Sequence, residues 1–275
     1  MPVISLDHRV AGPPELVAGV LRETAPAAAA VARAGARLTA QAALLVAGDE
    51  VRVTLPGGLV GCRTRITRAG RDGLWSELAA GPAAALRHAT RIVADGTGGT
   101  LVQDELAWTA PLGGFGRLTD PVLRRYGHRL LDARRDVLAE RAGELRVAPV
   151  VVGAAIVRDG RLLAAQRSYP AALAGRWELP GGGVEAGESE AGALVRECAE
   201  ELDARVEIGE RLGTDLPIGR RVLRIHTARL LPGSPEPQPR EHRALCWVGV
   251  REIAALGWLD ADRAVVAELL GLLRP

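Results

Sequence analysis

The chain has 275 residues, of which 48% are hydrophobic and 25% are charged, the mix of a folded protein with about two domains. Its net charge of +2 is too balanced to favour binding of a nucleic-acid polymer, and no apolar run reaches the ~18 residues of a membrane-spanning helix. The first residues lack a secretory-signal pattern, and Cys62, Cys198 and Cys246 are odd in number and far apart. We therefore expect a cytoplasmic protein with neither a disulfide framework nor a zinc site.

The first half of the chain predicts one strand, two helices, a series of strands and a long helix. The first strand covers Val3–Val10, and the two helices cover about Pro14–Arg22 and Ala27–Ala34. A long amphipathic helix over Leu118–Leu145 closes this half, with Asp120 and Pro121 as its start signal. Between them, turn residues separate six predicted strands: Gln41–Val46, Glu50–Leu55, Gly61–Thr67, Leu74–Ala79, Arg87–Asp95 and Thr100–Thr109.

This order of elements resembles the START-like helix-grip fold of the SRPBCC, or polyketide-cyclase-like, families. The closest local resemblance lies in segments 86–93, 98–108 and 110–114. The resemblance implies an α+β domain, in which a cavity between sheet and long helix often binds an apolar ligand. We expect Trp75, Trp108 and Phe115 to pack in the core and His88 to lie on an exposed strand face. The alternative is that they line such a cavity.

A domain boundary is predicted near residue 147, giving domains 1–147 and 148–275. The first part holds 19 arginines and 15 acidic residues, whereas the second holds 16 arginines and 18 acidic residues. The second part opens with a predicted hairpin, Val150–Val157 and Leu162–Arg167. A central strand at about Val222–Leu231 and a terminal helix from about Asp262 follow.

A glycine-rich loop, Pro180–Gly187, precedes a predicted helix that is capped by Ser189. Glu197, Glu200 and Glu201 stand at helical positions i, i+3 and i+4, so they project from one face. Three like charges repel one another unless a divalent cation lies among them, and oxygen ligands favour Mg²⁺ or Mn²⁺. Glycine lets backbone groups approach metal and phosphate closely. The alternative is an acidic surface helix.

This segment resembles the Nudix box, G-x5-E-x7-R-E-U-x-E-E-x-G-U, in which U is a bulky apolar residue. Asp203 replaces the last glycine, and Ala204 is smaller than the expected apolar residue. We expect Asp203 to adopt the left-handed conformation at the helix end, at a cost of about 1 kcal/mol. The resemblance implies an α/β/α sandwich with a mixed sheet. Six positions match in identity: Gly182, Glu188, Arg196, Glu197, Glu200 and Glu201.

The resemblance also implies roles for these residues. Glu200 and Glu201 would bind Mg²⁺ or Mn²⁺ with help from the Gly181 carbonyl, and Glu197 would bind the metal or orient the attacking water. Arg196 would hold a glutamate in place. The chemistry would be attack by water on a phosphorus of a nucleoside diphosphate-linked substrate.

The full-length pattern of this half, about 125 residues including the box, resembles the MutT-type branch of the family, and within it the CTP/dCTP pyrophosphohydrolases. Glu188 would support the loop and helix. Glu241 lies where this branch has an additional glutamate that acts as metal ligand or base; a solvated loop residue is the alternative. Arg167 could contact the nucleotide or lie on the surface. Glu178 could anchor the loop as a buried polar residue.

Asp262 lies where the MutT-type branch has its base-reading residue. Its carboxylate accepts hydrogen bonds, and cytosine offers its N4 amino group as a donor. The alternative is that Asp262 caps the last helix.

These inferences predict a Mg²⁺-dependent nucleoside triphosphate pyrophosphohydrolase that prefers CTP, dCTP or 5-substituted cytosine nucleotides. An 8-oxo-dGTP sanitising diphosphatase is the first alternative. The second is a regulatory protein in which the START-like half senses an apolar molecule and the Nudix half binds a nucleotide. The intact Glu197, Glu200 and Glu201 favour an enzyme.

Overall fold

The computed structural model describes residues 2–55, 61–110 and 120–273. The chain forms two compact units, Met1–Val147 and Ala148–Pro275, and each has its own sheet. Phe115 and segment 111–114 lie outside the described residues. Within the described part of the chain, no helix has the length and apolar character needed to cross a membrane.

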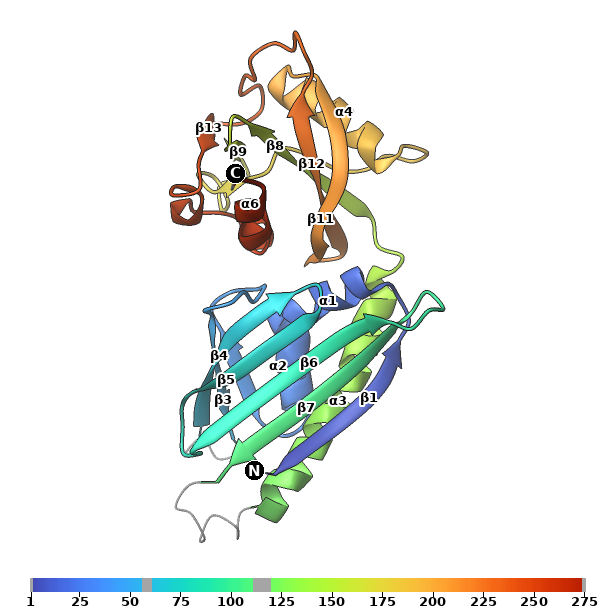
Figure 1. Cartoon of the computed structure of the whole chain (residues 1–275), viewed down its shortest axis with the longest axis vertical. Helices are drawn as coiled ribbons and strands as arrows, with labels where there is room; N and C mark the ends of the chain where they lie inside the picture. The colour runs from blue at the N-terminus through green and yellow to red at the C-terminus, as the bar shows by residue number, and fades with distance from the viewer. Residues whose placement is uncertain (1, 56–60, 111–119, 274–275) are drawn as a thin grey trace. The chain divides into compact units, whose positions relative to one another are not determined.

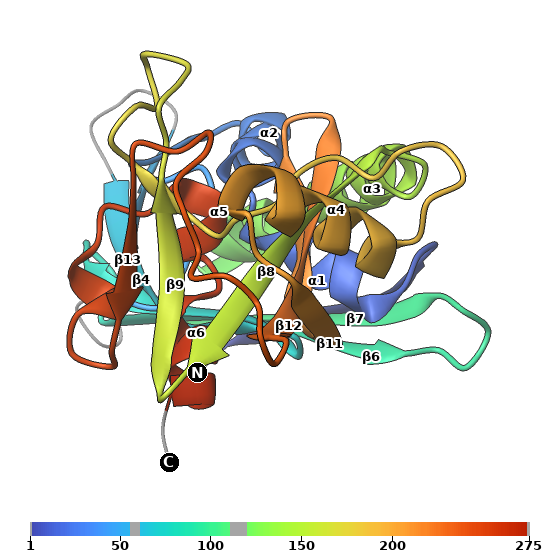
Figure 2. The same ribbon diagram turned by 90° about the horizontal axis from the view of Figure 1, so that it is seen from above.

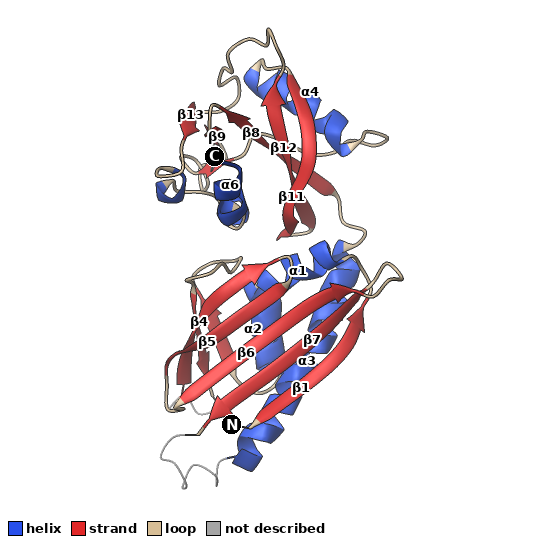
Figure 3. Cartoon of the chain, viewed as in Figure 1, coloured by secondary structure: helices blue, strands red, loops and turns tan. Residues whose placement is uncertain are grey.

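The first unit is a curled antiparallel sheet packed against helices (Figures 1 and 3). In its described residues the strand order is β1-β7-β6-β5-β4-β3-β2. The long helix α3 packs against β1 and against both short helices, and Ile4, Leu106, Trp108 and Leu131 form a buried cluster between sheet and helix. The elements are β1 Val3–Val10, α1 Pro14–Arg22, α2 Thr24–Arg33, β2 Arg37–Ala40, β3 Glu50–Thr54, β4 Gly61–Gly70, β5 Gly73–Ala80, β6 Ala85–Ala94, β7 Thr100–Thr109 and α3 Asp120–Leu145.

Three expectations for this unit are wrong. The predicted strand Gln41–Val46 is not part of the sheet. Leu44 and Leu45 are buried at the junction of α1 and α2, where the Leu45 amide donates to the Arg22 carbonyl over 2.8 Å. His88 is not on an exposed face, because its Nε2 lies 3.0 Å from Oδ1 of buried Asp104. Trp108 is in the core as expected, but Trp75 is only half-buried, and the Arg68 guanidinium lies over its ring at 4.7 Å from the centroid.

The second unit is an α/β sandwich around a mixed sheet with strand order β10-β9-β8-β12-β11, and β13 pairs with β9 (Figures 1 and 2). The β8–β12 pair is parallel, and the other pairs are antiparallel. Helix α4 packs on β8 and β11, and α6 packs on β8 and β9. The elements are β8 Val150–Arg158, β9 Arg161–Gln166, β10 Trp177–Glu178, α4 Glu190–Leu202, β11 Val206–Ile218, β12 Arg221–Leu230, β13 Ala244–Val248, α5 Asp260–Arg263 and α6 Val266–Leu273.

Two features of this unit were not anticipated. Strand β11 was missed because Gly209, Gly213 and Pro217 interrupt its sequence pattern, and its pairing with β12 indeed shifts register twice. The terminal helix is divided into α5 and α6. The hairpin of β8 and β9 and the inner position of β12 are confirmed.

Candidate active site

The glycine-rich loop is held along the edge of β8 by backbone hydrogen bonds. The Val152 amide donates to the Gly182 carbonyl and the Ala154 amide to the Pro180 carbonyl, each over 2.8 Å. Gly181 has φ +147°, and a Cβ on it would lie 2.1 Å from the Val152 carbonyl oxygen. Only glycine therefore lets the loop lie this close to the strand.

Helix α4 begins and ends as the sequence predicts. The Ser189 side chain accepts a hydrogen bond from the Gly192 amide over 3.0 Å, which caps the first turn. Asp203 has the left-handed conformation, with φ 57°. Leu194, Cys198 and Leu202 pack in the core cluster against β8, and Glu197 and Glu201, on the adjacent side of the helix, face the loop.

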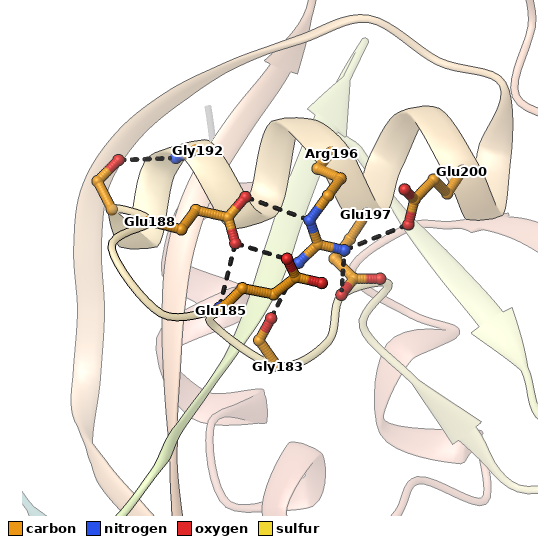
Figure 4. Close-up of polar contacts among 8 residues, drawn as sticks. Gly183, Glu185, Glu188, Gly192, Arg196, Glu197 and Glu200 are labelled. Carbon is orange, nitrogen blue, oxygen red and sulfur yellow. Dashed lines mark hydrogen bonds and ion pairs between the residues drawn. The ribbon is translucent and has the colours of Figure 1, made fainter.

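Arg196 is the centre of the carboxylate cluster (Figure 4). Its Nε and Nη2 each donate to Glu188 over 3.2 Å. Its Nη1 donates to Glu197 over 2.9 Å and to Glu200 over 3.2 Å, while Nη2 also reaches the Gly183 carbonyl over 3.0 Å. The guanidinium thus ties the loop to the helix and lowers the pKa of Glu188 by a hydrogen bond.

This arrangement corrects one expectation about charge. We expected a cation to relieve the repulsion among the three helix glutamates, but in the structure Arg196 compensates two of them, Glu197 and Glu200. An arginine directly before Glu197 and four residues before Glu200 is within reach of both. As the side chains stand, no three histidine, cysteine or acidic residues in the described ranges are grouped to hold a metal ion.

Glu201 differs from the other two glutamates. Its Oε2 accepts a hydrogen bond from the Gly181 amide over 3.0 Å. Burial raises the pKa of Glu201 to about 7, and the charge of nearby Glu197 acts in the same direction. Because burial disfavours the ionised form of Glu201, a positive charge beside this carboxylate would stabilise that form.

Gly182 positions Glu197. A Cβ added to Gly182 would lie 2.2 Å from Oε1 of Glu197 and 2.4 Å from its Cδ. The carboxylate therefore rests directly on the loop backbone, in space that any other residue would occupy. A Cβ on the next residue, Gly183, would meet nothing within 4 Å.

A second polar group lies beside the loop. Arg167 Nη1 donates to Glu178, and His242 Nε2 lies 3.3 Å from the other Glu178 oxygen. The His242 side chain is only 6% exposed. Arg167 is thus already engaged by a carboxylate, and its Nε also donates to the Tyr169 carbonyl. The sequence analysis singled out Glu178 as a residue that could anchor the loop, but it missed His242.

Asp262 is buried, with 4% of its surface exposed, and its Oδ1 accepts from the Leu179 amide over 2.9 Å. Burial raises the pKa of Asp262 to about 7, and the charge of Glu178 adds to this effect. The cap position of α5 is Leu259 and has no side-chain cap. The alternative role for Asp262 as a helix cap is therefore wrong.

Glu241 is exposed, on the loop that follows β12. The loop is fixed beside the end of α4, because the Arg240 amide donates to the Glu201 carbonyl over 2.9 Å. The Glu241 carbonyl accepts from the Ser168 hydroxyl. The structure therefore brings the box residues into one cluster and places the loop of Glu241 next to it, while Arg167 and Asp262 flank the Glu178–Leu179 segment.

A family model described as the NUDIX domain matches residues 147–269. The putative 8-oxo-dGTP diphosphatase 2 of Mycobacterium tuberculosis is 50% identical over 124 residues, which are 44% of this chain and 86% of that protein. The CTP pyrophosphohydrolase of Escherichia coli is 35% identical over 123 residues, 44% of this chain and 91% of that protein. The crystal structure of a MutT NUDIX hydrolase from Burkholderia pseudomallei is 31% identical, covering 44% of this chain and 96% of that chain with a TM-score of 0.37.

Proposed function

The chain belongs to the Nudix family and is a hydrolase of phosphoric anhydrides, and from this premise we propose that it converts nucleoside triphosphates to monophosphate and pyrophosphate. The observation that carries the proposal is the carboxylate cluster around Arg196, which is tied to a glycine loop lying against β8. Carboxylates beside exposed loop backbone suit a substrate that is a chain of phosphates bound with a cation.

Nudix hydrolases generally use a divalent metal ion, and the residues present fit one. The donors are carboxylates and backbone carbonyls, which suit Mg²⁺ or Mn²⁺. Glu201 carries a pKa raised to about 7 by burial, so a nearby cation would stabilise its ionised form. We propose Glu197, Glu200, Glu201 and the Gly181 carbonyl as the ligands. Such an ion neutralises charge on phosphate oxygens and lowers the pKa of bound water.

We propose the following roles for the other side chains of the site. Arg196 holds Glu188 and Glu197 in place by charged hydrogen bonds. Glu197 orients the attacking water or binds the metal, and Glu241 serves as an additional ligand or as the base. Arg167 contacts the nucleotide from the edge of the loop.

We propose that Asp262 reads the base. Its ionised carboxylate accepts from the N4 amino group of cytosine, which favours CTP, dCTP or 5-substituted cytosine nucleotides. A second candidate is 8-oxo-dGTP. Because the pKa of Asp262 is raised to about 7 by burial, a protonated fraction can donate to the O6 oxygen of a guanine. The relative that is 50% identical is named as an 8-oxo-dGTP diphosphatase.

The test measures kcat/KM of the full chain in Mg²⁺ for dCTP and 8-oxo-dGTP from pH 6 to 9. Cytosine reading predicts a preference for dCTP that rises as Asp262 ionises. Asp262→Asn should lower kcat/KM for dCTP by roughly 10- to 150-fold, with little loss for a purine nucleotide. A preference for 8-oxo-dGTP at every pH contradicts cytosine reading, and absence of pyrophosphate from both substrates contradicts the proposed reaction.

For the first unit we propose a START-like helix-grip domain that binds an apolar molecule. Its order of elements and a cavity of about 220 Å³ lined by residues of the sheet and of α3 support this. The alternative is a regulatory protein that senses this ligand and uses the Nudix unit only to bind a nucleotide. That alternative predicts nucleotide binding without pyrophosphate release.

A further inference from the structure

The cavity of the first unit is apolar over most of its wall. It has a volume of about 220 Å³. A cavity of about 150 Å³ with similar walls stays dry and admits benzene, so this one has room for an apolar molecule of roughly ten non-hydrogen atoms. The apolar side chains that form its wall include Leu74, Leu86, Leu106, Trp108, Leu123 and Leu130.

Besides the hydroxyls of Thr64, Ser76 and Tyr126, one buried charged group interrupts this wall. His88 and Arg134 both line the cavity, and both contact Asp104, which is 1% exposed. His88 Nε2 lies 3.0 Å from Asp104 Oδ1, and Arg134 Nη2 lies 3.5 Å from the same oxygen. The Thr90 hydroxyl donates to Asp104 over 2.5 Å. Polar groups in this position need partners, since burying them unpaired is costly.

The protonation states of this group follow from its surroundings. Burial alone would raise the pKa of Asp104, but the charge of Arg134 and hydrogen bonds from His88 and Thr90 hold it well below its usual range. Burial lowers the pKa of His88, so its ring is neutral. His88 therefore donates from Nε2 to the carboxylate, and its Nδ1 remains an acceptor. Within the described residues, the buried Nε of Arg134 has no hydrogen-bond partner.

The charges of this group cancel, because Arg134 and Asp104 carry one charge each and His88 carries none. An anionic ligand would therefore meet a carboxylate as well as a guanidinium. A neutral hydroxyl has the right capacity, since it can donate to His88 and accept from Arg134 at the same time. We propose that the first unit binds a neutral apolar alcohol or phenol whose hydroxyl lies between His88 and Arg134. This inference rests on the proposed ligand-binding function of that unit.

The experiment titrates the full chain with 2-naphthol and follows binding by calorimetry. The comparison probes are 2-methylnaphthalene, which has the same shape without the hydroxyl, and 2-naphthoate, which is anionic. We expect saturable binding of 2-naphthol with one site per chain and binding of 2-naphthoate at least about 10-fold weaker, the effect of losing good hydrogen bonds to a buried polar group. Absence of 2-naphthol binding, or tighter binding of 2-naphthoate, overturns the proposal.

Three variants locate the hydroxyl. His88→Phe should weaken 2-naphthol binding about 10-fold and leave 2-methylnaphthalene within about twofold. Tyr126→Phe is the matched control. It removes the Tyr126 hydroxyl, which lines the same cavity and is buried without a hydrogen-bond partner in the described residues, and it should change neither affinity. Equal losses in these two variants overturn the assignment. Ser76→Leu places a larger apolar side chain in the cavity, at the cross-strand partner position of His88, and should abolish binding of both probes.

Nucleotide hydrolysis by the same variants separates this inference from the proposed enzyme activity. The residues changed all lie in the first unit, so hydrolysis in Mg²⁺ should equal that of the parent chain. Loss of probe binding with hydrolysis intact is the expected result for Ser76→Leu. A parent chain that binds 2-naphthol but hydrolyses no nucleotide contradicts the enzyme proposal alone.

Discussion

Substitution of Gly182 by alanine tests whether the position of Glu197 controls hydrolysis. The added Cβ would lie 2.2 Å from Oε1 of Glu197, whereas an unstrained contact needs about 3.5 Å. The carboxylate must therefore move by about 1 Å. It is the end of a flexible side chain, so the strain is relieved by this movement and not by unfolding. A displacement of about 1 Å at a catalytic group can lower kcat about 100-fold.

Gly183→Ala is the matched control. A Cβ there meets nothing within 4 Å, and the carbonyl that accepts from Arg196 is retained. We expect Gly183→Ala to keep kcat within about twofold of the parent chain. Both variants should melt close to the parent, because alanine at an unstrained glycine position stabilises by about 0.4–1 kcal/mol through the unfolded state. The assay is release of pyrophosphate in Mg²⁺, with circular dichroism melting on the same samples.

A double variant tests whether Gly182→Ala lowers kcat by displacing Glu197. If Gly182→Ala acts only by displacing Glu197, it should cause no additional loss in a chain that already carries Glu197→Gln. Equal kcat for Gly182→Ala and Gly183→Ala would refute the reasoning. So would a full additional loss in the double variant, since the alanine would then act on something other than Glu197.

Three other predictions follow from the structure. Glu200→Gln and Glu201→Gln should each remove most hydrolysis in Mg²⁺ without lowering the metal-free melting temperature, because the Glu200–Arg196 pair is exposed and contributes little, and burial disfavours the ionised form of Glu201; wild-type turnover in both would show that the cluster is not the site. Asp262→Asn should raise the free energy of unfolding more at pH 8 than at pH 5. The raised pKa of about 7 in the folded chain exceeds the ordinary value near 4, so stability falls with rising pH between these values, by up to about 1.4 kcal/mol per pH unit; equal gains in urea unfolding at both pH values would contradict this. Residues 148–275 should fold and hydrolyse nucleotide alone, since a core of this size suffices for one domain; a fragment that is folded by circular dichroism but inactive would show that residues 1–147 contribute to the site.

Local sequence signals were sufficient for helix α4 and its loop. Ser189 and Asp203 mark the two ends of the helix, and both adopt the predicted cap conformations. The spacing of Glu197 and Glu201 places them one helical turn apart whatever surrounds the helix. The same kind of signal failed for β11, because its strand conformation is imposed by pairing with β12 and not by its own residues.

The sequence by itself determined the box, because its residues lie on one loop and one helix whose geometry follows from local rules. Only the tertiary structure decided which of these residues contact the Arg196 guanidinium. Arg196 reaches Glu188 and the Gly183 carbonyl only because the loop folds back along β8. It also decided the contacts of His88 with Asp104 and of His242 with Glu178. These pairs are far apart along the chain, and strand register and loop packing bring them together. The physical reason is that local preferences set conformation, whereas burial and charge compensation depend on which segments meet.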